Sequence, residues 1–217
     1  MALYCNDVDL LLLEAALFAD PAFVSFRRLS GASATLAGCT LTLAAPGATF
    51  ASAGITPGMV ATLSLPDGTS ATHTEIVAVT GPAAATVSIA RAAPGDPAIP
   101  PPLSGPVNVQ ITSFAAQASA IGDQLRAALG LHGEGAVPPP AEHPIHFRAA
   151  AVCGTLAILY RTLLSVKDAP AQTAAKLQLY AAAFNALRRQ IAAGIDTNGD
   201  GRPDKLISAG VVELYRA

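Results

Sequence analysis

The apolar residues near the start of the chain recur with helical spacing. They step by three and four residues along one face: Leu10, Leu13 and Leu17. Asn6 is placed to cap this helix, and two acidic residues in the first turn complement its positive end. The helix should end at Asp20, because the residue before a proline is pushed out of the helical region. The pattern therefore predicts one amphipathic helix at the N-terminus.

From about residue 35 the apolar period changes to two, which indicates β-strands. Five short runs alternate apolar and polar residues: 38–43, 60–65, 72–79, 86–90 and 107–112. The sequence "PDGT" (residues 66–69) separates the second and third runs. It predicts a hairpin turn, because proline presets φ and Asp-Gly accepts the positive φ that closes such a loop. The runs predict a small antiparallel barrel or sandwich.

The second half of the chain has a helical pattern. One helix is predicted over 114–130, a second over 145–166, and a third starts at Pro170, a residue favoured in the first turn. The third helix carries the most regular apolar stripe in the chain, with steps of three and four, and should end at Gly194: Leu177, Tyr180, Phe184, Leu187 and Ile191. Such a stripe packs against another helix, and the preceding helix is the expected mate.

These patterns predict an α+β fold. The N-terminal helix and three C-terminal helices would form a helical bundle, with the small antiparallel β barrel or sandwich inserted between them. The expected domains are the N-terminal helix at 1–34, the β unit at 35–112, the helical bundle at 113–194, and an Asp/Gly-rich turn with a C-terminal docking tail at 195–217.

Composition narrows the functional classes. Charged residues make up 13% of the chain, against about 25% in an average soluble protein. A weakly charged, alanine-rich surface is easily buried against a partner, although a GC-rich genome accounts for the bias equally well. The net charge of −2 offers no basic field for a phosphate backbone, so sequence-specific nucleic-acid binding is not expected. We also expect no membrane span and no secretory signal, and three scattered cysteines indicate reduced thiols.

The acidic stretch "DTNGDGRPD" raises the question of a calcium site. Side chains with oxygen ligands fall at positions 1, 3, 5 and 9 of an EF-hand-type loop: Asp196, Asn198, Asp200 and Asp204. Position 12, where a bidentate carboxylate should close the coordination shell, is Ile207. The other interpretation is a structural turn, because Asp, Asn and Gly turn a chain without an ion. No other cofactor is expected.

Enzymatic chemistry finds little support in the sequence. His143 and His146 form a His-x-x-His pair beside Glu142, but the pair lacks the further ligands that zinc requires. There is no Gly-x-Ser-x-Gly elbow, no Cys-His signature and no phosphate-binding glycine loop. We therefore expect a protein that is not an enzyme.

The C-terminus is unusually apolar and aromatic for a chain end. Leu214, Tyr215 and Arg216 are residue types that anchor interfaces, so the tail is a candidate for docking on a partner. A final strand or strap packed on its own domain explains the same residues as well.

Three segments resemble the head-to-tail connector (adaptor) proteins of tailed bacteriophages and related gene transfer agents. They are "NDVDLLLLEAALFADPAF", the stretch from "AGITPGMVATLSLPDGT" to "IPPP", and "LQLYAAAFNALRRQIAAGIDTNGDGRPDKLISAGVVELYRA". Members of that family are helix bundles, so the β unit would be an elaboration. The resemblance implies a homo-oligomeric ring, usually of twelve subunits, between the portal and the next neck or tail protein.

The resemblance also implies where the protein acts. It would be located in the virion neck, and in the host cytoplasm during assembly, with the C-terminal tail docked on the portal. DNA would pass through the ring without sequence-specific binding. The leading hypothesis is therefore a structural virion protein, and the alternative is a calcium-dependent binding module that uses the loop at 196–204.

Overall fold

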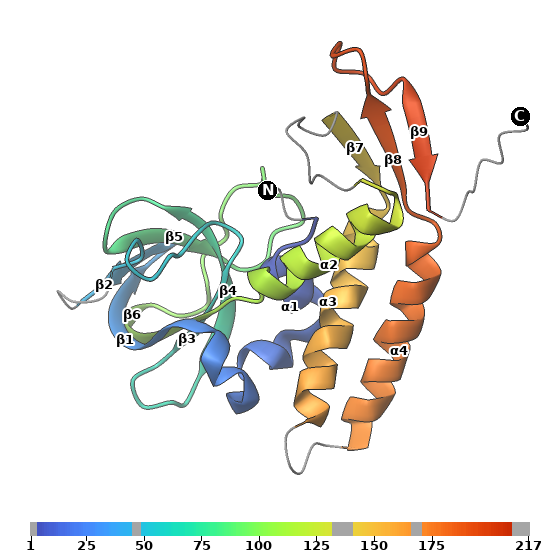
Figure 1. Cartoon of the computed structure of the whole chain (residues 1–217). Coiled ribbons are helices and arrows are strands. Elements are labelled where there is room, and N and C mark those ends of the chain that lie inside the picture. The colour runs from blue at the N-terminus through green and yellow to red at the C-terminus, as the bar shows by residue number, and fades with distance from the viewer. Residues whose placement is uncertain (1–3, 45–48, 132–140, 166–170, 210–217) are drawn as a thin grey trace, which may run out of the picture. The chain divides into compact units, whose positions relative to one another are not determined.

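The computed structural model describes residues 4–44, 49–131, 141–165 and 171–209. The chain divides into two compact units (Figure 1). We call Asn6–Phe114 the barrel unit, and Met1–Cys5 together with Ala115–Ala217 the helical unit. Each is described by itself.

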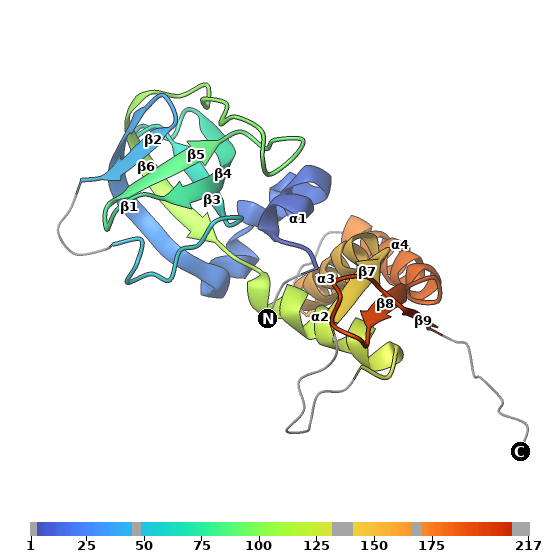
Figure 2. The same ribbon diagram turned by 90° about the horizontal axis from the view of Figure 1, so that it is seen from above.

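The barrel unit is built around a closed barrel in which every pairing is antiparallel (Figure 2). Its strands follow the spatial order β1-β2-β5-β4-β3-β6, and β6 pairs with β1 to close the ring. The bounds are β1 Arg27–Ala37, β2 Thr40–Leu43, β3 Val60–Ser64, β4 Ala71–Val79, β5 Ala84–Ser88 and β6 Gly105–Thr112.

Each strand contributes apolar side chains to the inside of the barrel. The largest of them are fully buried: Leu36, Leu41, Leu63, Ile76, Val87, Val109 and Ile111. The predicted hairpin between β3 and β4 is confirmed, with Gly68 at φ +73° and the Asp67 carboxylate accepting the Thr69 amide at 3.0 Å.

The longest strand, β1, was not predicted from the sequence. Its register against β6 shifts between Arg27 and Leu29 and again between Leu29 and Ala32, and Gly31 within it has φ +65°. These β-bulges interrupt the two-residue period that marks a strand. Without that period the segment resembled a short connector.

The N-terminal helix α1, Asp7–Glu14, belongs to the barrel unit. Asn6 caps it as predicted, in a capping box with Asp9. The 3-10 turns η1, Ala15–Phe18, and η2, Pro21–Phe26, lead on to β1. The predicted apolar face is wrong for Leu13, which is 57% exposed. The buried face of α1 runs through Asp7, Leu10, Leu11 and Glu14, and Leu13 points away from it.

An aromatic cluster joins these turns to the end of the barrel where β1 begins and β6 ends. The Phe114 ring lies 5.2 Å from the Phe18 ring, 5.2 Å from Phe23 and 5.6 Å from Phe26, measured between centroids. Tilted and edge-on aromatic pairs of this kind are stabilising beyond their buried area. The segment from α1 to η2 is thus packed on the barrel.

The helical unit contains three long helices and a small sheet. The helices are α2, Ala115–Ala128, α3, Phe147–Leu164, and α4, Ala171–Arg188. The sheet is antiparallel, in the order β7-β8-β9, with bounds β7 Ala141–Ile145, β8 Ala192–Asp196 and β9 Lys205–Ser208. Strand β7 leads directly into α3, and β8 follows closely after α4.

The predicted fold class is wrong. The protein is a mixed α/β protein in which a closed six-stranded barrel forms a unit of its own, not a helical bundle with a small inserted barrel. The helix that was expected to complete the bundle packs with the barrel, and β7, β8 and β9 add a sheet to the C-terminal part. Alternation identified five barrel strands but could not show with which partner the first helix packs.

Helix α3 is the core of the helical unit, and Gly154 is its closest packing point. A Cβ atom at Gly154 would lie 2.9 Å from Ile121 Cγ2 and 2.9 Å from the ring carbons Cδ2 and Cε2 of Phe184. Real Cβ atoms essentially never approach so closely. The glycine therefore lets α2 and α4 pack against α3 at this level.

Gly154→Ala should destabilise the helical unit by about 1–3 kcal/mol through overpacking, although alanine normally stabilises a helix by about 1 kcal/mol relative to glycine. Urea unfolding followed by circular dichroism measures the change. Gly95→Ala is the control, because open space surrounds Gly95 and its φ is not positive. Equal stability of Gly154→Ala and the wild type would contradict the packing described.

Candidate functional site

The acidic loop joins β8 to β9 in a β-hairpin. All four predicted metal ligands lie in it, and each of their side chains accepts a hydrogen bond from the loop itself. Asp196 accepts the amides of Gly199 at 2.6 Å and Gly201 at 2.8 Å. Asp204 accepts the Thr197 amide at 3.2 Å and its hydroxyl at 2.6 Å. These bonds close the turn through groups of the loop itself.

The side chains at the two middle ligand positions of the loop, Asn198 and Asp200, also accept backbone amides. Asn198 accepts the Asp200 amide at 3.0 Å, and Asp200 accepts the Arg202 amide at 2.8 Å. The backbone amides, that of Gly201 above all, hold the pKa of Asp196 below its usual range. A strand follows the loop where an EF-hand has a helix. Among the described residues, no group of three or more His, Cys, Asp or Glu side chains could hold a metal ion.

The helix stripe lies at the contact between α4 and α3. Four of its members are half-buried on α4, which ends at Arg188 rather than at Gly194: Leu177, Tyr180, Phe184 and Leu187. Tyr180 stacks on Tyr160 of α3 with centroids 5.7 Å apart, and Lys176 donates to the Tyr160 hydroxyl at 3.1 Å. Ile191 is fully buried, but it lies in the turn that enters β8.

The other residues and segments singled out in the sequence are the C-terminal tail, the histidine pair, the cysteines and the longest apolar helix. Leu214, Tyr215 and Arg216 lie outside the described residues. His146 is exposed at the start of α3, with φ +63°. The three cysteines, all within the described ranges, form no disulfide. In the described part of the chain one helix, α3, has the length and apolar composition of a membrane span, but 61% of it is buried inside the protein, as in a core helix.

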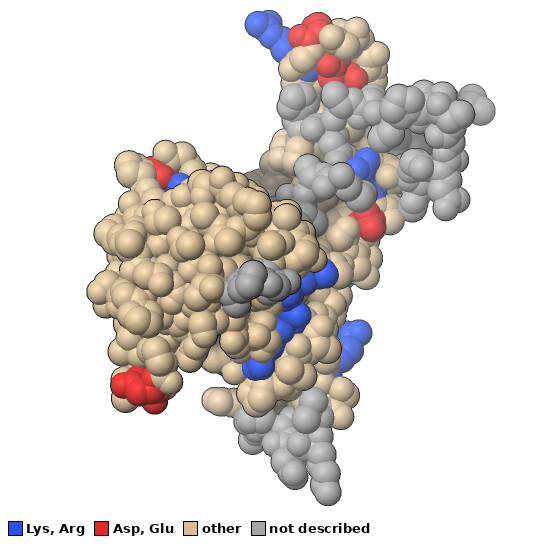
Figure 3. Space-filling model, turned by 90° about the vertical axis from the view of Figure 1, so that its left-hand side faces the viewer, with Lys and Arg blue, Asp and Glu red and all other residues tan. Residues whose placement is uncertain are grey.

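The barrel surface carries few charged side chains, apart from the half-buried Arg27 and the exposed Arg28 at the start of β1. Residues 31–114 include only four charged side chains: Asp67, Glu75, Arg91 and Asp96. Glu75 and Arg91 are buried and pair with each other, so only two acidic side chains in this stretch reach the surface. Figure 3 shows a broad face with few charges among uncharged residues.

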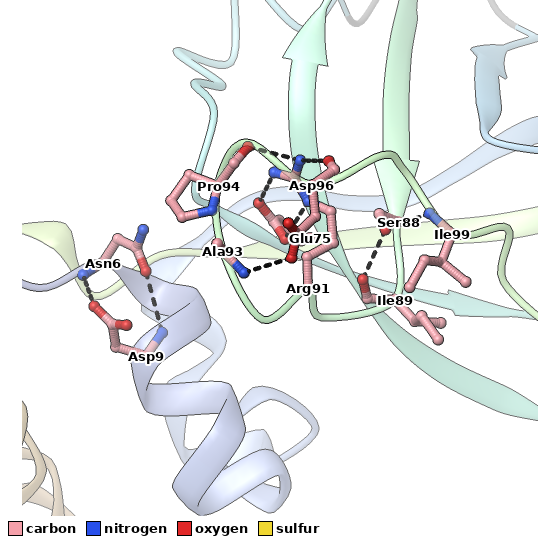
Figure 4. Close-up of polar contacts among 10 residues, drawn as sticks. All are labelled: Asn6, Asp9, Glu75, Ser88, Ile89, Arg91, Ala93, Pro94, Asp96 and Ile99. Carbon is pink, nitrogen blue, oxygen red and sulfur yellow. Dashed lines mark hydrogen bonds and ion pairs between the residues drawn. The ribbon is translucent and has the colours of Figure 1, made fainter.

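The buried ion pair has the geometry of a strong one (Figure 4). Arg91 donates to Glu75 from Nη2 at 2.6 Å and from Nε at 3.2 Å. Its Nη1 donates to the carbonyls of Pro94 at 2.8 Å and Asp96 at 2.6 Å, which fixes the loop after β5. The neighbouring Glu75 raises the pKa of Arg91. The pair neutralises itself inside the barrel unit and adds no charge to the surface.

Large apolar side chains are exposed on both units. Leu12 is 59% exposed, and Leu13 and Val24 of the barrel unit are exposed to a similar extent. On the helical unit Leu179 and Leu206 are more than 60% exposed. The leucine run at 10–13 was visible in the sequence, but its periodicity did not reveal which leucines face outward.

Comparison of the chain with known protein families, with curated proteins and with solved structures found no match.

A buried carboxyl ties the start of the barrel unit to its end. Asp7 is 3% exposed, and its Oδ1 accepts the Phe114 amide at 2.8 Å. Burial raises the pKa of Asp7 to about 6, against a smaller opposing effect of the bonds from Phe114 and Ser113. Asp7 therefore binds a proton more readily in the folded unit than in the unfolded chain.

This pKa shift predicts a pH dependence of stability. A raised carboxyl pKa means that the folded unit gains stability as the pH falls from above 6 towards 4, and Asp7 should contribute about 2 kcal/mol more at pH 4.5 than at pH 7.5. Burial lowers the pKa of His73 in the same unit, which acts in the opposite direction. The quantity to measure is therefore the difference in unfolding free energy between the wild type and Asp7→Asn at each pH. A difference that does not change with pH would contradict the assignment.

Proposed function

We propose that the chain is a structural virion protein, a head-to-tail connector that joins the portal to the tail through protein–protein contacts. The observation that carries the proposal is the low number of charged side chains on the surface of residues 31–114, where only Asp67 and Asp96 are exposed. Charged side chains must lose water when an interface forms, and the centres of protein interfaces are depleted in them. A face of this kind can be buried at little desolvation cost.

The exposed leucines support the same function. Leu12, Leu13 and Val24 provide exposed apolar area on α1 and η2 of the barrel unit. Large apolar side chains that remain exposed in an isolated chain mark surfaces that associate with a partner when they are grouped.

The assignment to a connector comes from the resemblance of the three segments quoted above. Under this proposal the subunits form a ring, usually of twelve, with the portal on one side and the next neck or tail protein on the other. The tail residues Leu214, Tyr215 and Arg216 would dock on the portal. A net charge of −2 is compatible with a channel that passes DNA without binding it.

Adding charge to the barrel surface tests the proposal. Thr42 on β2 and Ala71 on β4 are exposed, so Thr42→Lys/Ala71→Lys should change the unfolding free energy by less than about 0.5 kcal/mol. The same variant should prevent assembly, because two cations would be buried at the interface. Light scattering measures the mass of the protein alone and mixed with a candidate portal protein.

Thr42→Gln/Ala71→Gln is the matched control, because glutamine has a long side chain without the charge. We expect this control and the wild type to form a ring-sized complex, and the lysine variant to remain monomeric. A lysine variant that assembles like the wild type would contradict a role for the barrel surface. A wild type that never assembles with any portal would contradict the connector itself.

The competing calcium module makes a different prediction. Because the side chains of the acidic loop already accept the amides around them, we propose that the loop is a structural turn and that the protein needs no cofactor. The melting temperature and the mass of the complex should be the same in calcium and in a chelator. A melting temperature that falls in chelator, and is restored in the wild type but not in Asp200→Ala by calcium, would support the calcium module.

A further inference from the structure

A pocket of about 250 Å³ opens on the helical unit where α2, α3 and α4 meet. Its lining residues recur with helical spacing on each helix: Ile121 and Gln124 on α2; Gly154, Ala157, Ile158 and Arg161 on α3; and Ala181, Phe184 and Asn185 on α4. Each helix therefore presents one continuous face to the pocket.

The pocket exists because the side chains in its lining are small at the points where the helices would otherwise fill it. Gly154 brings Ile121 and Phe184 close together at one side. Ala157 and Ala181 leave the space beside them unoccupied. The result is a partly apolar hollow between three helices, not a gap at a chain end.

Three polar side chains line this hollow: Gln124, Arg161 and Asn185. Within the described part of the chain, none of them has a hydrogen bond or an ion pair, whereas Arg91 is fully engaged with Glu75 and two carbonyls. The lining contains no Asp or Glu, so Arg161 is its one charged group. One helix supplies the guanidinium, and each of the two others supplies a side-chain amide.

We propose that this pocket binds a carboxylate. A guanidinium presents two parallel N–H donors that match the two oxygens of a carboxylate, and this pair is stronger than a neutral hydrogen bond. The side-chain amides of Gln124 and Asn185 are further donors, and the ring of Phe184 offers an apolar surface for the carbon chain that bears the carboxylate. The volume accommodates a group of the size of an Asp or Glu side chain or a short dicarboxylic acid.

The proposal is independent of the connector function, because it rests on the chemistry of the residues that line the pocket and not on the barrel surface or the exposed apolar side chains. The carboxylate can be borne by a protein, such as an acidic side chain of a neighbouring subunit, or by a free small molecule. The chemistry of recognition is the same for both, and the probes below separate them.

Titration of the full-length protein by NMR tests the proposal, with succinate as the free probe and a short peptide that contains one Glu as the protein-like probe. We expect saturable shifts of the Gln124 and Asn185 side-chain amides and of Arg161 Nε–H. Succinamide, and the same peptide with Gln in place of Glu, should cause no such shifts at matched ionic strength. Tighter binding of succinate would identify a small-molecule site, and tighter binding of the peptide a site for an acidic side chain.

Two variants complete the test. Arg161→Gln should weaken binding by at least about tenfold, since the loss of one charged hydrogen-bond pair costs about 1.5–3 kcal/mol. Arg202→Gln, which removes an exposed cation from the loop between β8 and β9, should bind like the wild type. Absence of saturable shifts with both probes, or equal weakening by both variants, would overturn the proposal and leave the connector hypothesis unaffected.

Discussion

The pairing of β1 with β6 is the interaction on which the barrel unit depends. It joins segments at opposite ends of the unit and aligns Arg27 with Thr112, next to the aromatic cluster around Phe114. It also removes the free edges of the barrel, so the described strands of this unit leave no unpaired edge to which another chain could add. The surfaces that remain for a partner are the outer faces of the strands, the loops, and α1 and η2 with the exposed Leu12, Leu13 and Val24.

Few cations lie on the barrel unit. Only Arg27, Arg28 and Arg91 of the thirteen Lys and Arg residues belong to the barrel unit. One of these three is enclosed with Glu75 inside the unit, where it holds a loop instead of repelling a partner. The helical unit carries the other cations, among them Arg161 at the pocket. The two units thus differ in the number of cations they carry, because ten of the thirteen Lys and Arg residues belong to the helical unit.

The sequence predicted elements whose signal is local. The barrel strands with clean alternation, the hairpin at Pro66–Thr69 and the Asn6 cap could be read directly, because each depends on residues close together in the chain. Strand β1 could not, because bulges and Gly31 interrupt its period. Strand β8 is buried at every position and so shows no alternation, and Pro144 within β7 argues against a strand. Only the tertiary structure determines the packing of the first helix on the barrel.

Some candidate sites could be predicted from nearby residues in the sequence, and others are formed only by the tertiary structure. The oxygen-rich side chains at 196–204 were obvious in the sequence, but only the hydrogen bonds show that they already turn the chain. The Glu75–Arg91 pair spans sixteen residues and has no local signature. The spacing of Gly154, Ala157 and Arg161 on α3 was present in the sequence, yet the pocket requires Gln124 and Asn185 from two other helices. The periodicity of one helix does not show which residues of other helices lie beside it.

The most direct test of the central claim is the protein composition of purified phage or gene-transfer-agent particles from the organism that encodes the chain. Quantitative mass spectrometry compares the amount of this protein with that of the portal protein. The proposed connector ring predicts that the protein is present in the particles in an amount about equal to the portal. Particles with a full complement of portal and none of this chain would contradict the proposal.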